Sequence, residues 1–438
     1  MGSKRKIADT DRKLTRYYKS CDKWRALLAA LERGPRNPRN ELTIGIVSML
    51  LEQDETTIDC ALSDKPLLAS WYGSAPEIYA AMDLHYVSPL DNVLQSLYDY
   101  NLQDLEECDR MGIPEDICSL LRLSTYSVRA GIVPTPTVVI GMMQPCDGMR
   151  ALSETFKNEK EWGDVPYFAL DSTYSYDGST DEDFAYFAGE LRRMIQFLEQ
   201  HTGRKLDFGR LREVVEESNR QYELWVEYNE LRRAIPCPGP AYEGTSVGYI
   251  LTQFVRSGDP RATDLMKIWL SETEQSVREK RGAVEDERIR ILWADIVPAW
   301  NGEISNWLAA EWGANIVMDW QSYAPYTAID TSSEDAMLKG LAKRALTEVM
   351  MIRQSGPVQV VLEDVTRVVA DYSIDCVIFP GHMGHKDQSG YIGFLRELCR
   401  QLRVPFLAFT SSLFDPRYVP LDRLKNTMSE FFSVHGLG

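Results

Sequence analysis

The sequence predicts an α/β protein with two parallel-sheet domains of the Rossmann or flavodoxin type, joined by a helical segment and preceded by a helical extension. Three observations predict this architecture. Short apolar runs alternate with amphipathic helices in two separate parts of the chain, which is the order expected of parallel sheets. The stretch between these parts has helical spacing. At 438 residues, the chain is also too long to form one hydrophobic core.

These patterns divide the chain into four parts. Residues 1–64 are predicted to form the N-terminal helical extension, and residues 65–180 the first α/β domain. Residues 181–285 are predicted to form the helical connecting segment, and residues 286–438 the second α/β domain. Each α/β part is long enough for a separate sheet with its covering helices.

The elements of the first half follow from periodicity and from helix stop signals. Residues 10–18 and 24–33 are amphipathic and predict two helices, and Gly34-Pro35 ends the second. The first α/β domain then shows a strand at 138–141, a helix at 149–156 and a strand at 165–170.

The second half shows the same kinds of pattern. Apolar residues at helical spacing predict a helix from 181, which ends at the His-Thr-Gly-Arg sequence 201–204, and a second helix follows from 206. The second α/β domain shows strands at 289–294, 314–319, 376–379 and 405–409, with helices at 300–312 and 393–402.

Charge and hydropathy exclude several classes of protein. The net charge of −17 is spread along the chain and would repel a phosphate backbone, so nucleic acid is not expected as a partner. No stretch approaches the roughly 20 apolar residues that cross a bilayer. The basic N-terminus leads into charged residues without the apolar core of a signal peptide, so a cytoplasmic location is expected.

Two of the eight cysteines are candidate ligands. No CxxC pair occurs, so neither a zinc ribbon nor a disulfide framework is indicated. Cys146 directly follows the strand at 138–141, and Cys118, in Pro-Glu-Asp-Ile-Cys at 114–118, is likewise expected on a loop after a strand. Ligands bind outside the carboxyl ends of parallel strands, and a thiolate near a helix N-terminus suits metal ligation. Buried structural thiols are the ordinary alternative.

A third candidate is the loop after the strand at 376–379. Two of the five histidines, His382 and His385, lie there beside Asp387. Imidazole and carboxylate together could bind a metal, which leaves a mononuclear metal hydrolase as one interpretation. A polar loop that caps the sheet is the alternative.

Glu77 is a candidate of another kind. It stands in the first turn of an apolar helix in Ser-Ala-Pro-Glu at 74–77, where a carboxylate commonly stabilises the helix dipole. If it were buried near an active site, its pKa would rise and it could transfer protons. The position of Glu77 in the sequence favours the first interpretation, a carboxylate that caps the helix.

In order along the chain, these segments resemble the 2-hydroxyacyl-CoA dehydratase and benzoyl-CoA reductase subunits, of the 2-hydroxyglutaryl-CoA dehydratase D-component type. The resemblance covers roughly residues 65–430. Seven short motifs carry it, at 74–83, 114–118, 137–149, 201–207, 211–219, 290–293 and 404–418.

The resemblance implies an enzyme of two homologous subunits, in which three cysteines of each subunit hold a 4Fe-4S cluster. A separate ATP-hydrolysing activator would deliver electrons at very low potential. The acceptor would be an acyl-CoA, dehydrated by way of a ketyl radical when it is an (R)-2-hydroxyacyl-CoA. Reduction of an aryl-CoA such as benzoyl-CoA is the alternative reaction.

Carried over by position, the resemblance makes Cys118 and Cys146 cluster ligands and places Glu77 near the acyl group. The third ligand departs from the family, because its cysteine position falls on His385 or Gly384. Cys376 lies earlier, inside the strand, and is expected in the core. Either His385 ligates iron, as imidazole does in Rieske centres, or this subunit lacks a stable cluster and is a non-catalytic partner. We expect the first.

Overall fold

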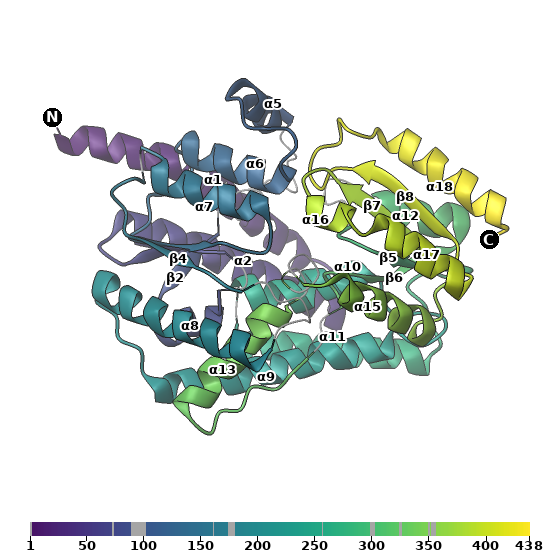
Figure 1. Cartoon of the computed structure of the whole chain (residues 1–438). Coiled ribbons are helices and arrows are strands. Elements are labelled where there is room, and N and C mark those ends of the chain that lie inside the picture. The colour runs from purple at the N-terminus through teal and green to yellow at the C-terminus, as the bar shows by residue number, and fades with distance from the viewer. Residues whose placement is uncertain are drawn as a thin grey trace.

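The computed structural model describes residues 2–71, 74–88, 102–160, 162–173, 180–255, 257–297, 303–323, 326–348, 351 and 356–438 (Figure 1). The side chains of residues 2–11, Phe254 and Asp387 lie outside this description, as do residues 300–302, with which one predicted helix begins. No helix in the described ranges is long and apolar enough to cross a membrane.

The first sheet consists of four parallel strands in the order β2-β1-β3-β4. The strands are β1 (Leu67–Ala69), β2 (His85–Val87), β3 (Val138–Met142) and β4 (Tyr167–Leu170). The chain runs from β1 to β2 on one side and then returns to β3 on the other. The carboxyl ends of β1 and β3 therefore border a topological switch point, where open α/β sheets bind ligands.

The second sheet repeats this order with four parallel strands, β6-β5-β7-β8. The strands are β5 (Ile289–Trp293), β6 (Ala314–Asp319), β7 (Cys376–His382) and β8 (Phe406–Ser411). Its switch point lies between the carboxyl ends of β5 and β7. The predicted fold class, with two parallel-sheet domains, is confirmed.

Helices cover both sheets. They are α1 (Gly2–Leu31), α2 (Pro38–Leu62), α3 (Pro76–Ala81), α5 (Leu102–Arg110), α6 (Ser119–Arg129), α7 (Asp147–Asn158), α8 (Asp181–Thr202), α9 (Phe208–Leu231), α10 (Ala241–Glu243), α11 (Pro260–Arg278), α12 (Glu303–Trp312), α13 (Glu334–Thr347), α15 (Val358–Asp371), α16 (Lys386–Ser389), α17 (Ile392–Leu402) and α18 (Leu421–His435), with two π-helical stretches, η1 (Gly244–Tyr249) and η2 (Leu251–Val255).

One prediction about the N-terminal extension is wrong. The two helices expected at 10–18 and 24–33 are parts of the single helix α1, which packs on α2. Leu14, Tyr17, Cys21 and Trp24 are all buried and follow one another at intervals of three or four residues, so they form one continuous apolar stripe. No glycine or proline interrupts this stripe, and the helix continues through it.

The helical connecting segment lies beneath both sheets in the view of Figure 1. Helix α8 starts at a capping box between Thr180 and Asp183 and ends at Gly203, whose φ is +70°. Helix α13 follows β6 in the chain but packs against α8, and its buried residues belong to the same core as the first sheet. The second sheet has separate cores on its two faces.

Candidate functional site

The carboxyl ends of the central strands hold the polar residues of the candidate site. In the first domain, β3 leads to Cys146, which is the N-cap residue of α7. In the second domain, β5 leads to Asp295 and β7 leads to His385. These three residues therefore border the two switch points, and the prediction that Cys146 lies at a sheet edge is confirmed.

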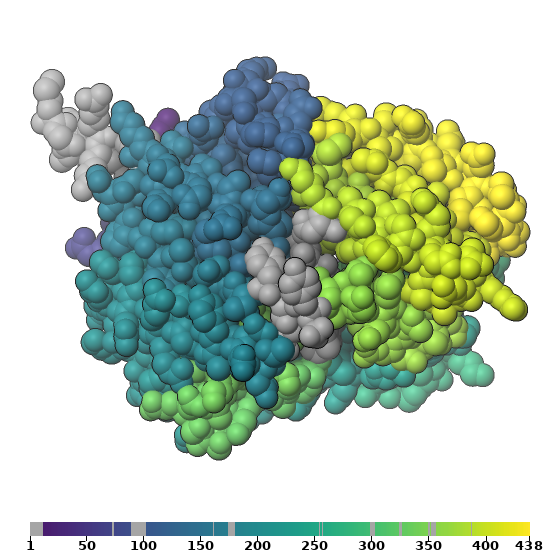
Figure 2. All heavy atoms as spheres, in the orientation of Figure 1, coloured from purple at the N-terminus to yellow at the C-terminus, as the bar shows by residue number. Residues whose placement is uncertain are grey.

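Cys118 is positioned by the start of a helix and not by the end of a strand. The prediction that it lies on a loop after a strand is wrong, because helix α5 precedes it and it forms the N-cap of α6. The second domain holds this helix start in place. The Ser119 hydroxyl oxygen accepts hydrogen bonds from the Ser412 hydroxyl at 3.0 Å and from the backbone N–H of Phe414 at 2.9 Å. Cys118 therefore lies where the two domains meet. Figure 2 shows the boundary between the blue and teal first domain and the yellow second domain.

The glycine at 384 allows the loop after β7 to approach Cys118 closely. Gly384 has a φ of +90°, and a Cβ atom there would lie 2.0 Å from the backbone nitrogen of Cys118. No L-amino acid with a side chain fits this position, since both the backbone conformation and the space require glycine. This contact brings the next residue, His385, to the start of α6.

His385 is buried between a carboxylate and a thiol. Its Nδ1 lies 3.4 Å from Oδ2 of Asp295, whose side chain is fully buried, and the Cys118 thiol lies close enough to influence the imidazole. Burial alone would lower the pKa of His385, but Asp295 and Cys118 together raise this pKa well above its usual value. Without a bound metal, the raised pKa favours the protonated ring, whose Nδ1 faces Asp295.

Cys146 lies on the adjacent helix α7, close to the segment that carries Cys118. A Cβ at Gly148 would lie 3.8 Å from the Cys146 sulfur and 3.5 Å from Cγ2 of Ile117, so the first turn of α7 packs against the residue before Cys118. Within the described ranges, no group of three or more histidine, cysteine, aspartate or glutamate side chains is placed to hold a metal ion. The structure thus joins Cys118 to His385 and leaves Cys146 on the adjacent helix.

The chemistry of these donors fits an iron–sulfur cluster. Cys118 and Cys146 are the N-cap residues of α6 and α7, and cysteine sulfur is the usual ligand of iron in such clusters. A metal-binding histidine commonly donates its second ring nitrogen to a carboxylate, as His385 does to Asp295. All three candidate ligands are buried. In residue type, two thiols and a carboxylate-backed imidazole are therefore donors of the kind that iron–sulfur centres use.

His382 does not share this role. Its Nε2 donates to the backbone carbonyl of Ile296 at 2.7 Å, and its Nδ1 lies 3.1 Å from the Ser411 hydroxyl. Burial lowers the pKa of His382, so the ring is neutral and both nitrogens have partners. In the alternative interpretation of a mononuclear metal site at His382, His385 and Asp387, the first ligand is therefore already engaged, and the Asp387 side chain is outside the described residues.

Glu77 is buried in an ion pair and does not act as a helix cap. Its Oε1 accepts hydrogen bonds from Arg344 at 2.9 Å and from Ser218 at 2.8 Å. Arg344 also donates to Asn219 and lies over the Tyr222 ring at 4.2 Å. These partners come from α9 and α13 and fix the carboxylate in the first domain.

Lys386 connects the loops that carry the candidate ligands. Its ammonium lies 3.0 Å from Asp116 and 3.4 Å from Asp147. Asp116 is two residues before Cys118, and Asp147 directly follows Cys146. One lysine of the second domain thus pairs with both cysteine-bearing segments of the first.

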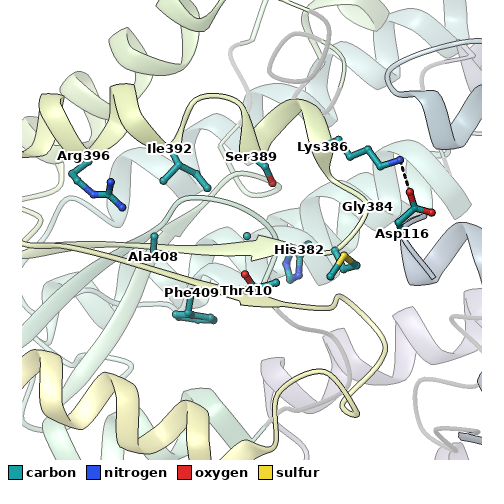
Figure 3. Close-up of a pocket in the computed structure, with 12 residues that line it drawn as sticks. Asp116, His382, Gly384, Lys386, Ser389, Ile392, Arg396, Ala408, Phe409 and Thr410 are labelled. Carbon is teal, nitrogen blue, oxygen red and sulfur yellow. Dashed lines mark ion pairs between the residues drawn. The ribbon is translucent and has the colours of Figure 1, made fainter. Parts of the chain in front are cut away.

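A cavity of about 430 Å³ opens beside this lysine (Figure 3). Its wall includes His382, Gly384, Lys386, Ile392, Arg396 and Phe409. Figure 3 shows Arg396 on α17 at one end and Lys386, paired with Asp116, at the other. Among the described residues, no carboxylate forms an ion pair with the exposed Arg396. The cavity therefore offers one uncompensated positive charge.

Sequence reasoning missed Asp295 and Arg344. The signal for Asp295 was present, because it follows the apolar strand Ile289–Trp293 just as Cys146 follows β3. Arg344 gives no local signal, since its role depends on α13 returning to the first domain. Cys376 is fully buried in β7, so the prediction that it belongs to the core is confirmed.

Comparison with known proteins shows that most of the chain matches one protein family. Residues 72–433 match the family described as 2-hydroxyglutaryl-CoA dehydratase, D-component. The chain is 21% identical to the (R)-phenyllactyl-CoA dehydratase alpha subunit of Clostridium sporogenes over 78% of its own length and 82% of that protein. It is also 21% identical to one of the subunits of benzoyl-CoA reductase from Thauera aromatica, over 83% of its own length and 87% of that protein. The (R)-2-hydroxyisocaproyl-CoA dehydratase alpha subunit of Clostridioides difficile is 20% identical over 60% of the chain and 65% of that protein.

Proposed function

Because the chain belongs to the 2-hydroxyglutaryl-CoA dehydratase D-component family, we propose that it is the iron–sulfur subunit of an enzyme that dehydrates an (R)-2-hydroxyacyl-CoA. Two of the three relatives named above are alpha subunits of such dehydratases. The subunit names of these relatives support a partner subunit, and we propose that it is homologous to this chain. The likeness to a benzoyl-CoA reductase chain supports reduction of an aryl-CoA as the alternative reaction.

The observation that carries the proposal is the contact between Cys118 and His385. These residues come from different domains and are 267 positions apart, yet both are buried, and the loop of His385 closely approaches the backbone of Cys118 at Gly384. Both lie within the residues that match the family. We therefore propose Cys118, Cys146 and His385 as ligands of a 4Fe-4S cluster. Such a cluster would pass single low-potential electrons, supplied by a separate ATP-hydrolysing activator, to the substrate.

The surrounding residues would prepare the site for this chemistry. The buried thiols and imidazole would keep water away from the reacting groups. Glu77 remains our candidate for a polar or proton-transfer contact to the acyl group, and Arg344 would hold its carboxylate in one orientation. Lys386 would draw the cysteine-bearing segments toward the loop of His385.

We place the anionic part of the CoA in the cavity beside Lys386. The protein carries a net charge of −17, so an anion needs a local positive charge, and Arg396 provides one. Arg396→Gln should weaken CoA binding about tenfold, the loss of one charged hydrogen bond, and should leave pantetheine binding unchanged. Arg400→Gln is the matched control, because Arg400 lies on the same helix but pairs with Glu397. Equal CoA affinity in both variants, measured by titration calorimetry, would contradict this placement.

Purification without oxygen, followed by iron and sulfide analysis, tests the cluster. About four irons and four sulfides on this chain are expected, and Cys118→Ala or Cys146→Ala should remove the visible absorbance of the cluster. A chain that carries no iron but still binds its partner chain would instead be the non-catalytic half of the enzyme. Iron without acid-labile sulfide would indicate a mononuclear site.

A further inference from the structure

We propose that Asp295 is the positioning residue that makes His385 a ligand, so that the third cluster position is built for imidazole and not for thiolate. This inference rests on the proposed function. It concerns a residue outside the proposed ligand set, and it explains how the chain can differ from the three-cysteine pattern that its family resemblance implies. The arrangement of Asp295, His385 and Cys118 carries it.

The carboxylate of Asp295 is held rigidly. Its side chain is fully buried, and its Oδ1 accepts a hydrogen bond from the backbone N–H of Ile296 at 2.8 Å. The carbonyl of Ile296 in turn accepts from His382 Nε2 at 2.7 Å. The backbone carbonyl of Asp295 also accepts from the N–H of Trp320 at 3.3 Å. The second oxygen, Oδ2, therefore faces His385 from a fixed position.

This geometry selects the ring nitrogen that can bind iron. Nδ1 of His385 lies 3.4 Å from Oδ2, and a carboxylate oxygen can only accept, so Nδ1 carries a proton. The lone pair of the neutral ring is then on Nε2. Fixing the tautomer and the ring plane in this way is what carboxylates do for metal-binding histidines.

A thiolate at position 385 would not benefit from the same carboxylate. A thiolate has a single donor atom and no tautomer to fix. It would also bring a second negative charge toward the fully buried Asp295, and like charges at a buried site repel strongly. Asp295 therefore favours imidazole and disfavours cysteine at the same position.

The test is that removing the charge of Asp295 should have opposite effects on an imidazole ligand and on a thiolate ligand at position 385. Wild type, Asp295→Asn, His385→Cys and the double variant are reconstituted without oxygen, and iron and acid-labile sulfide are measured at limiting iron. Asp295→Asn should lower iron affinity about 10- to 100-fold in the His385 background. In the His385→Cys background, the same change should leave the affinity unchanged or raise it. Nitrogen hyperfine coupling to the cluster, present in wild type, should be absent in both His385→Cys proteins.

Asp319→Asn is the matched control. Asp319 is a buried carboxylate at the end of the neighbouring strand β6, and it accepts from the N–H of Ser322 at 2.8 Å. The Asp319→Asn variant should bind iron with the affinity of wild type. An equal loss from Asp295→Asn in both backgrounds would show a merely structural role and overturn the inference. A wild-type chain that binds no iron would overturn the proposed function itself. If wild type binds iron and Asp295→Asn binds it with the same affinity, this inference alone would be overturned.

Discussion

Gly384→Ala should separate the loop of His385 from Cys118. The added Cβ would lie 2.0 Å from the Cys118 nitrogen, whereas Cβ atoms keep at least about 3 Å from such atoms, so the backbones must move apart by roughly 1 Å. The φ of +90° adds strain of about 1–3 kcal/mol for any residue with a side chain. The His385 hydrogen bond to Asp295 is already 3.4 Å long and would not survive a displacement of this size.

Urea denaturation and cluster content measure the two consequences. We expect Gly384→Ala to lower the free energy of unfolding by at least the backbone strain and to reduce the iron bound per chain. Gly393→Ala is the control, because Gly393 lies in α17 of the same domain and a Cβ there meets nothing within 4 Å. If both variants kept wild-type stability and wild-type iron content, the close approach of the two loops would be refuted.

Three further perturbations test the electrostatics. Arg344→Met should leave the Glu77 carboxylate buried without its cation and lower the free energy of unfolding by about 3–5 kcal/mol in urea titrations; a loss below about 1 kcal/mol would contradict the pairing. In the metal-free protein, the raised pKa of His385 contributes stability that is complete below its unfolded pKa of about 6.5 and is lost as the pH rises through the higher folded pKa. The melting temperature of wild type relative to His385→Gln should therefore fall as the pH increases above about 6.5, and a constant difference would argue against the imidazolium. Lys386→Gln should cost less than about 1 kcal/mol, because its ion pairs are half exposed, and the difference from wild type should vanish in about 1 M salt.

The sheets and the position of one candidate ligand could be predicted from the sequence because their signals are local. A run of buried apolar residues such as Val138–Met142 indicates a parallel strand, and the rule that ligands bind at the carboxyl edge then singles out Cys146. The same rule applies to Asp295, which follows Ile289–Trp293. It was missed because a single acidic residue after a strand is common in turns.

The meeting of Cys118 with His385 could not be predicted from local pattern. Cys118 follows a helix and a turn, so no strand edge places it. Its position depends on contacts between domains, such as the hydrogen bonds of Ser119 to Ser412 and Phe414. These join residues almost 300 positions apart, for which periodicity carries no information. Family resemblance supplied the pairing instead.

The charges around position 385 explain why imidazole can stand where the family resemblance implies a cysteine. Replacing a thiolate ligand by neutral imidazole removes one negative charge from the site, and such exchanges raise the potential of an iron–sulfur centre. The buried carboxylate of Asp295 returns one negative charge next to the imidazole. His385 and Asp295 together thus carry the charge of a single thiolate, distributed over two residues that follow neighbouring strands of one sheet. A site that keeps this total charge is better suited to low-potential electrons than imidazole alone would be, so the pair is more consistent with a retained cluster than with a lost one.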